Sequence, residues 1–174
     1  MSGESVSARQ VSTGSPEKAA SARFRSVLGS FCSGVTVITA MGEHGPVGFT
    51  CQSFCSLSLD PPQVVVCVGL RSTTWPVIRG KRTFCVDILA EDQRQLSDGF
   101  SRSAGDKFQG VRWKASPHGS PQLAGAAAWL DCELHAEYPG GDHVIAVADI
   151  RWMDGEADSR PLLYHRGKYA RTGG

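Results

Sequence analysis

The amino-acid sequence predicts a mainly β protein, an antiparallel barrel that is closed or nearly closed, with a few helices covering its ends. Three observations support this prediction. Short runs rich in Val, Ile, Thr and Phe recur along the chain, Gly and Pro separate them as in hairpins, and few segments show helical spacing of apolar residues. With 174 residues, of which 41% are hydrophobic, the chain suits one domain with a substantial core.

The N-terminal region divides into a tail and a helix. Residues 1–15 are rich in Ser and Gly and lack apolar periodicity, which predicts a disordered tail ahead of one domain spanning 16–174. Pro16 and Glu17 suit the start of a helix, and Gly34 can end it. Apolar residues recur between them at helical spacing, namely Phe24, Val27, Leu28 and Phe31. We therefore expect an amphipathic helix whose apolar side packs against another surface.

Apolar runs predict the first four strands, at 35–40, 47–53, 63–69 and 83–89. A polar helical segment (91–101) and a loop with Gly, Lys and aromatic residues follow. The last two strands flank a Pro-Gly-Gly-Asp turn and form a predicted hairpin. In the first strand of this hairpin, alternate residues are expected to face water or a partner, namely Trp129, Asp131, Glu133, His135 and Glu137.

Composition excludes several classes of function. The 18 Lys and Arg residues nearly balance 17 Asp and Glu, so the net charge of +1 provides no basic field for a nucleic acid. No apolar run approaches the length of a membrane span, and the first residues lack the apolar centre of a secretory signal. These features predict a cytoplasmic protein that binds neither nucleic acid nor membrane.

The cysteines and the common catalytic motifs give mostly negative evidence. The six cysteines form no CxxC pair and have no histidine at zinc-ligand spacing, so they predict reduced, mostly buried thiols and no metal site. No GxGxxG follows a strand, and neither HExxH nor GxSxG occurs. Gly29 and Gly34 have P-loop spacing, but Val35 and Thr36 stand where Lys and Ser or Thr are required.

Two runs of small polar side chains lie between the predicted strands. The first contains Thr50, Gln52, Ser53, Ser56 and Ser58, and the second contains Ser72, Thr73 and Thr74. Such residues can hydrogen-bond a polar heterocycle and a phosphate, to which Arg71 could add charge. For either run alone, turn formation is the preferred explanation, because Ser and Thr populate turns for local reasons. Two runs at successive strand ends favour a ligand site.

His143 follows the turn of YPGGDHVIAVADI, at the mouth of a predicted strand. It is either a solvated turn residue or a group aimed at a ligand over the end of the sheet. The residues alone leave both interpretations open.

A series of segments in the same order resembles the flavin reductase family, whose members have the FMN-binding split-barrel fold. These segments are FRSVLGSFCSGVTVIT, GFTCQSFCSLSLDPPQVVVCVG, STTWPVIRGKRTFCVDILAEDQ, DKFQG, GDHVI and LLYHRGKY. The similarity runs from about Phe24 to Tyr169. Such proteins are the reductase components of two-component flavin-dependent monooxygenases.

The resemblance implies a homodimer of six-stranded antiparallel split β-barrels with a few flanking helices. It implies FMN or FAD in a groove at the dimer interface and NADH, with NADPH as the alternative, stacked on the flavin. Reduced flavin would pass to a separate monooxygenase that oxidises aromatic compounds or secondary metabolites. FMN or FAD would be a substrate or a loosely bound cofactor.

The resemblance also assigns residues to the flavin and nicotinamide. The isoalloxazine and ribityl would contact Gly48, Phe49, Thr50, Cys51, Gln52, Ser53 and Phe54, with Ser56 and Ser58 nearby. The ribityl and phosphate would contact Cys67, Arg71, Ser72, Thr73 and Thr74. Lys107 and Phe108 would lie near the flavin across the dimer, and Tyr169 would be either a contact of the nicotinamide nucleotide or part of a solvated final strand.

His143 would be the catalytic residue, lying beside the nicotinamide. Hydride transfer requires stacked rings more than an acid or a base, so the expected role of His143 is to position the nicotinamide and offset charge on reduced flavin.

Three positions depart from the pattern of that family. Gln52 stands where Asn is commoner, Asp87 where the strand motif usually has Asn, and Cys55 where Thr or Ser is frequent. These differences leave the choice between FMN and FAD open. Two further hypotheses also stay open: an oxidase that holds its flavin tightly, and a flavin-binding module without activity on the same scaffold.

Overall fold

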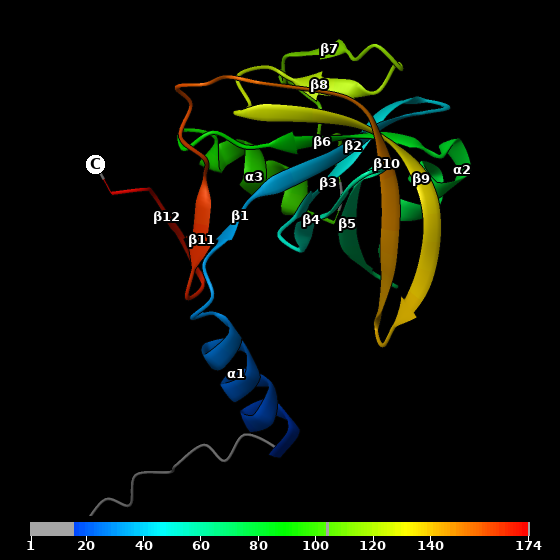
Figure 1. Cartoon of the computed structure of the whole chain (residues 1–174). Helices are drawn as coiled ribbons and strands as arrows, with labels where there is room; N and C mark the ends of the chain where they lie inside the picture. The colour runs from blue at the N-terminus through cyan, green and yellow to red at the C-terminus, as the bar shows by residue number, and fades with distance from the viewer. Residues whose placement is uncertain (1–15, 104, 174) are drawn as a thin grey trace, which may run out of the picture.

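The computed structural model describes residues 16–103 and 105–173 (Figure 1). Its centre is a seven-stranded sheet in the order β3-β2-β6-β9-β10-β5-β4, in which all neighbours are antiparallel. These strands are β2 (Thr36–Gly42), β3 (Gly45–Cys51), β4 (Phe54–Leu59), β5 (Pro62–Gly69), β6 (Thr83–Ile88), β9 (Ala128–Gly140) and β10 (His143–Gly155). The predicted mainly β class is confirmed, and the tail predicted at 1–15 lies outside the described residues.

The sheet curls because its two edge strands are consecutive in the chain. Only Gln52 and Ser53 connect β3 to β4, so the two edges must meet at that point. The Ser53 hydroxyl donates to the Cys67 carbonyl (2.7 Å) and accepts from the Cys67 amide (3.1 Å), which fastens this connection to β5. The result is a barrel that is joined at one corner and open elsewhere between its edges.

Strand β4 makes the sheet one strand wider than the six expected, because the composition of 54–59 predicts a connection between strands. Its sequence, FCSLSL, exposes Cys55 and Ser56, leaves Ser58 half-buried, and is similar to a loop in composition. Helix α2 (Trp75–Lys81) was also not predicted, since it is short and contains Pro76 and Gly80. The predicted segment at 91–101 does contain a helix, α3 (Arg94–Ser101).

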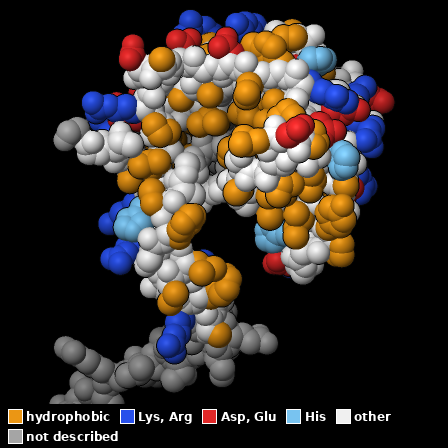
Figure 2. Space-filling view, in the orientation of Figure 1, with side chains coloured by type: hydrophobic (Ala, Val, Ile, Leu, Met, Phe, Trp, Pro, Cys, Tyr) orange, Lys and Arg blue, Asp and Glu red, His pale blue; other side chains and the backbone are white. Residues whose placement is uncertain are grey.

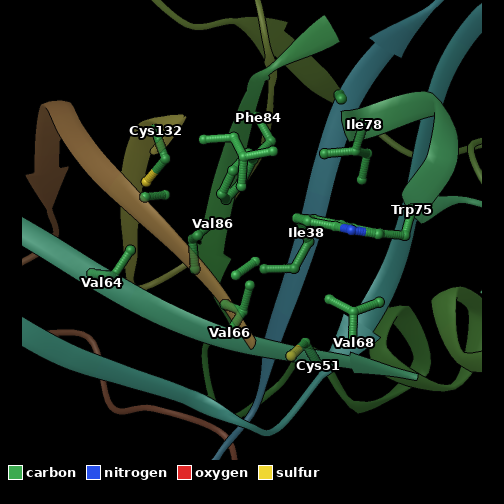
Figure 3. Packing of buried hydrophobic residues seen from close by; sticks show 14 of the residues in the cluster. Ile38, Cys51, Val64, Val66, Val68, Trp75, Ile78, Phe84, Val86 and Cys132 are labelled. Carbon is green, nitrogen blue, oxygen red and sulfur yellow. The ribbon is translucent and has the colours of Figure 1, made fainter. Parts of the chain in front are cut away.

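The barrel interior is filled by aliphatic and aromatic side chains from all around the sheet. Figure 3 shows Ile38, Val66 and Phe84 converging with Trp75 from α2. Trp75 packs edge-to-face on Phe84, with ring centroids 6.0 Å apart, and its indole N–H donates to Glu137 at the barrel rim (2.7 Å). Helix α2 therefore closes one end of the barrel.

A second apolar cluster joins the outside of the barrel to α3 and the C-terminal segment. Phe100 of α3 is fully buried together with Val35, Val37 and Leu89. A three-stranded sheet lies beside it, formed by β1 (Ser33–Gly34), β11 (Leu163–His165) and β12 (Lys168–Ala170). This packing holds α3 against one face of β3, where Phe100 lies next to Gly48.

A small hairpin covers the outer face of β6 and β9. It consists of β7 (Trp113–Ala115) and β8 (Pro121–Leu123), and we call it the flap. Beneath it Asp131 is fully buried, with one carboxylate oxygen accepting from the His118 backbone N–H (2.9 Å). The expectation that Asp131 faces water or a partner chain is therefore wrong, because the flap covers that face.

Helix α1 (Pro16–Leu28) starts where the sequence predicts but ends before Gly34. Figure 1 shows it standing away from the barrel. Its apolar residues are not packed within the chain, since Phe24 is 65% exposed and nearby Phe31 is 82% exposed. The predicted amphipathic helix is present, but the described residues do not supply a surface that covers Phe24 and Phe31, and Figure 2 shows apolar side chains along the helix.

All six cysteines are free thiols. None of the helices in 16–103 and 105–173 has the length and apolar character that crossing a membrane requires.

Candidate active site

His143 lies where β10 begins and β5 ends. Its partner in the strand pairing is Gly69, and a Cβ added to that glycine would lie 3.8 Å from Nε2 of the imidazole. Nδ1 lies 2.7 Å from Oδ1 of Asp142, and this hydrogen bond is the main reason that the pKa of Asp142 falls below its usual value. An ionised Asp142 holds the proton on Nδ1, so Nε2 is the nitrogen left to face a ligand.

Residues 52 and 53 connect β3 to β4 next to the start of β10. The Ser53 hydroxyl forms hydrogen bonds within the protein, whereas the Gln52 amide faces solvent. Ser53 uses its hydroxyl on the Cys67 backbone, as described above, and lies 3.3 Å from the Cys51 thiol. The neighbouring Gln52 side chain is exposed. Gln52 is therefore the side chain of this connection that is free to bind a ligand.

Strand β3 presents its predicted contact residues to two opposite sides. Phe49 and Cys51 belong to the barrel core, where Phe49 packs edge-to-face on Trp75. On the other side, the Thr50 hydroxyl donates to the Ser97 carbonyl of α3 (2.7 Å). These side chains hold the strand between core and helix, so a ligand would meet mainly the backbone of β3.

Gly48 lies on the α3 side of β3. A Cβ at Gly48 would lie 2.9 Å from both the Ile38 carbonyl oxygen and a ring carbon of Phe100. Only glycine therefore lets α3 approach the strand so closely.

The segment after β5 lies over one hollow of the surface. The Ser72 hydroxyl accepts from the Trp75 amide (3.1 Å) and shapes the turn into α2. Arg71 is exposed. Thr73 and Thr74 line a hollow of about 270 Å³, and the hollow is also lined by Gly48, Lys107 and Phe108. This hollow brings together three segments that the sequence predicts to contact flavin. We call it the phosphate hollow because Thr73 and Thr74 are the residues predicted to contact the flavin phosphate.

Lys107 is the charged group of the phosphate hollow. Its ammonium donates to the carbonyls of Gly48 and Phe100, at 3.1 Å each, and partial burial lowers its pKa. An ammonium has three N–H donors, so one has no partner among the described residues and can bind an anion. Phe108 is buried edge-to-face on Phe100 at 4.9 Å and supports the lysine from below.

Tyr169 lies in a different hollow, of about 540 Å³, on the far side of the Thr50–α3 contact. Its hydroxyl donates to Asp98 at 2.7 Å, and burial is the main cause of its raised pKa. The Arg94 guanidinium stacks over its ring at 5.1 Å. Thr50 and Gln52 line this hollow together with Arg94, Asp98 and Lys168, three charged residues that the sequence reasoning missed.

The remaining predicted residues lie on β4 and β5. Ser56 is exposed on β4, and Ser58 and Phe54 are half-buried. None of these three lines a hollow described above. Cys67 lies on the outer face of β5, alternating with the buried Val66 and Val68. Among the described residues, no three His, Cys, Asp or Glu side chains lie together as a potential metal site.

The outer face of β5 and β10 carries apolar side chains next to His143. Val65 and Cys67 are half-buried there, Ile145 pairs directly with Cys67, and Tyr138 pairs with Ile145 and is exposed. We call these four residues the outer patch. Figure 2 shows hydrophobic side chains gathered over the β9–β10 hairpin.

Comparisons with known proteins agree with this architecture. The family model described as flavin reductase like domain matches residues 28–173. The chain is 46% identical over 147 residues to the reductase subunit HsaB of a flavin-dependent monooxygenase from Rhodococcus jostii, covering 84% of this chain and 75% of that protein.

Two solved structures are similar over nearly the whole chain. A homologue of nitrilotriacetate monooxygenase component B from Mycobacterium thermoresistibile superposes with a TM-score of 0.88 at 42% identity, covering 90% of this chain and 89% of that one. The NADH:FAD oxidoreductase SgcE6 of Streptomyces globisporus, in complex with NAD and FAD fragments, superposes with a TM-score of 0.85 at 32% identity, covering 94% and 98%.

Proposed function

The chain belongs to the flavin reductase-like domain family, and we propose that it transfers hydride from NADH to FMN or FAD and releases the reduced flavin to a separate monooxygenase component. One observation carries the proposal for this chain. The phosphate hollow brings together Thr73, Thr74 and Lys107. His143 pairs with Gly69 at the end of β5, and the segment that follows β5 leads to the phosphate hollow. The site therefore offers an anion-binding end and an imidazole facing outward.

The residues of the phosphate hollow fit the phosphate end of a flavin nucleotide. Two threonines supply hydroxyl donors, and the free N–H of Lys107 supplies a charge-assisted one. Because the lysine is already desolvated, an incoming anion restores the favourable environment that burial has removed. The exposed Gln52 amide can bind the polar edge of the ring system.

His143 has a positioning role in this scheme. When bound, a flavin supplies a ring system that accepts hydride from a reduced nicotinamide. Asp142 holds the imidazole through Nδ1, so Nε2 has a fixed direction from which it can contact a nicotinamide nucleotide. Gly69 leaves the space beside Nε2 open, since any longer side chain there would cover the imidazole.

The experiment replaces His143 with Ala and with Gln. We expect His143→Ala to raise the KM for NADH about tenfold at saturating FMN, because positioning is lost, while the Kd for FMN stays within about twofold. His143→Gln should retain part of the wild-type KM because its amide can still bind a ligand. Equal loss of both affinities, or loss of neither, would refute the assignment.

We further infer that the functional unit is a homodimer. The runs QVVVCV and VIAV are apolar on both faces of β5 and β10, as in strands covered on both sides. The barrel core covers only one face. In the isolated chain, Tyr138 of the outer patch and the apolar residues of helix α1 are exposed, and the other outer-patch residues are half-buried. A second copy of the chain covering the outer patch would border the His143 site.

Sedimentation velocity tests the dimer directly. The wild-type chain should sediment at about twice its 18.6 kDa mass. Val65→Lys, which places a charge in the outer patch, should shift it toward the monomer, whereas the same change at the exposed flap residue Ala115 should not. A wild-type monomer at micromolar concentration would overturn this inference.

We also propose a cytoplasmic location. Six free thiols, three of them buried, support a reducing compartment in which no disulfide is required.

A further inference from the structure

The flap packs against the part of the chain that carries Lys107. The segment 105–112 precedes the flap and includes both Lys107 and Phe108. The indole ring of Trp113, the first flap residue, lies edge-to-face on the Phe108 ring, with centroids 6.2 Å apart. At the other end of the flap, the fully buried Leu123 packs in the same apolar cluster as Phe108. Both ends of the flap therefore support the segment that lines the phosphate hollow.

This support reaches the ammonium of Lys107. Phe108 packs edge-to-face on Phe100, with centroids 4.9 Å apart, and the Phe100 carbonyl accepts from Lys107 at 3.1 Å. The Gly48 carbonyl accepts a second bond from the ammonium at the same distance. A movement of the flap that shifts Phe108 would therefore also shift the anion-binding group.

Two buried carboxyl groups hold the flap on the barrel. Oδ1 of Asp87 accepts from the Leu123 amide at 2.7 Å, and Oδ2 of Asp131 accepts from the His118 amide at 2.9 Å. Both carboxyl side chains are fully buried, and Oδ1 of Asp131 has no hydrogen-bond partner among the described residues. Within 16–103 and 105–173, the only ion pair that reaches either carboxyl joins Asp131 to His118 at 3.0 Å. Charge on both carboxyls is therefore costly while the flap is closed.

The surroundings of the two carboxyls add no further cation. Besides each other, they face hydroxyl, thiol and imidazole side chains from three strands and the flap, namely Thr39 of β2, Cys85 of β6, Cys132 of β9 and His118 of the flap. Burial raises the pKa of both thiols, which stay neutral. Burial is also the main reason that the pKa of Asp87 rises to about 8. Water reaches the carboxyl when the flap opens, so ionisation of Asp87 favours the open flap.

We propose that the flap is a pH-dependent latch on the phosphate hollow: ionisation of the carboxyl pair opens the flap and removes the support of Lys107. The link to the flavin phosphate rests on the proposed function. The closed flap holds the protonated form of Asp87, and the open flap exposes the carboxylate to water. Opening therefore becomes more favourable as pH rises from about 4 to about 8, and it levels off above this range.

Amide hydrogen exchange followed by NMR measures opening of the flap without a ligand. The reporters are the amides of His118 and Leu123, which donate to the two carboxyls. In the wild type, their protection factors should fall about fiftyfold between pH 6 and 8. In Asp87→Asn they should stay within about twofold, because the amide does not titrate, and His118 is the same in both chains. Lys114→Ala, at an exposed flap position, is the matched control and should follow the wild type.

The amides of β5 distinguish opening of the flap from unfolding of the whole domain. The flap amides should be less protected than those of β5 at every pH. Equal protection of the flap and β5 would mean that the flap opens only together with the barrel, which would overturn the latch. An equal fall of flap protection in wild type and Asp87→Asn would overturn it as well.

FMN and riboflavin test the link to the phosphate hollow, because they differ only in the phosphate. At pH 8, saturating FMN should raise flap protection about tenfold, since a bound anion favours the position of Lys107 that the closed flap supports. Saturating riboflavin should change flap protection by less than about twofold. Trp113→Ala removes the contact with Phe108 and should reduce the effect of FMN to about threefold or less.

The outcomes of the two parts are separate. Equal effects of FMN and riboflavin, or an undiminished effect of FMN in Trp113→Ala, would overturn the link between the flap and Lys107. Failure of the wild-type chain to bind either flavin would overturn the proposed function and this link with it. The exchange measured without flavin would still decide whether ionisation of Asp87 opens the flap.

Discussion

Asp87 provides a prediction that the hydrogen bonds of the structure define closely. It is fully buried beneath the flap, where Oδ1 accepts from the Leu123 amide at 2.7 Å. Oδ2 accepts from the Thr39 hydroxyl at 3.1 Å, and the same hydroxyl lies 2.5 Å from the Pro121 carbonyl oxygen. The single hydroxyl proton of Thr39 can satisfy only one of these two acceptors at a time, and burial raises the pKa of Asp87 to about 8.

This protonation makes stability depend on pH in a defined direction. The usual pKa of 3.8 applies to the unfolded chain and about 8 to the folded one, so between these values the folded state holds the extra proton. The free energy of unfolding then falls as pH rises, by ~1.4 kcal/mol per pH unit. Between pH 5 and 8 the free energy of unfolding falls by about 4 kcal/mol. The decrease is slightly smaller than the full slope over three pH units, because Asp87 in the folded state is already half ionised at pH 8.

The substitution Asp87→Asn removes the titration and keeps the geometry, because an amide offers one acceptor and one donor in place of the protonated carboxyl. The variant should gain about 4 kcal/mol over wild type between pH 5 and 8. Urea unfolding followed by tryptophan fluorescence, at one protein concentration and four pH values, measures this difference. Asp158→Asn, at an exposed site, is the control. Parallel pH profiles for wild type and Asp87→Asn would refute the reasoning.

Three further substitutions have expected outcomes. Gly48→Ala forces a methyl group against Phe100 and should lower the free energy of unfolding by about 2 kcal/mol in urea titrations; an unchanged midpoint would show that α3 can move away. Lys107→Met should weaken FMN about tenfold and flatten the salt dependence of its Kd, measured by fluorescence at several ionic strengths; an unaltered salt profile would exclude the phosphate contact. Tyr169→Phe loses the bond to Asp98 and should cost about 1 kcal/mol of stability in urea while leaving the KM for NADH unchanged; a raised KM would instead support a nicotinamide contact.

Apolar periodicity predicted the elements that pack on the core. The runs at 35–40, 63–69 and 83–89 form β2, β5 and β6 because each supplies buried residues. These residues occupy alternate positions in β5 and consecutive positions in β2 and β6, which are covered on both faces. Strand β4 was missed because it is an edge strand whose side chains mostly face solvent. The mainly β fold class and the resemblance to the flavin reductase family are both confirmed by the comparisons.

The faces of the strands and the flap were harder to predict. Asp131 alternates with Leu130 and Cys132 as an outward residue should, yet it is buried because the flap folds over it. No apolar pattern in 113–123 indicates that this segment forms a cover. Similarly, alternation alone could have separated Phe49 and Cys51 from Thr50, but only the packing of α3 shows which side a ligand can reach.

Hydride transfer to flavin is tested by the loss of nicotinamide absorbance when the purified chain is mixed with NADH in air, with and without excess FMN or FAD. We expect rapid oxidation of NADH that requires both the protein and added flavin. NADPH and riboflavin in the same plate rank the alternatives. No oxidation with any combination would contradict the account, and oxidation by a yellow protein without added flavin would contradict release of the reduced flavin.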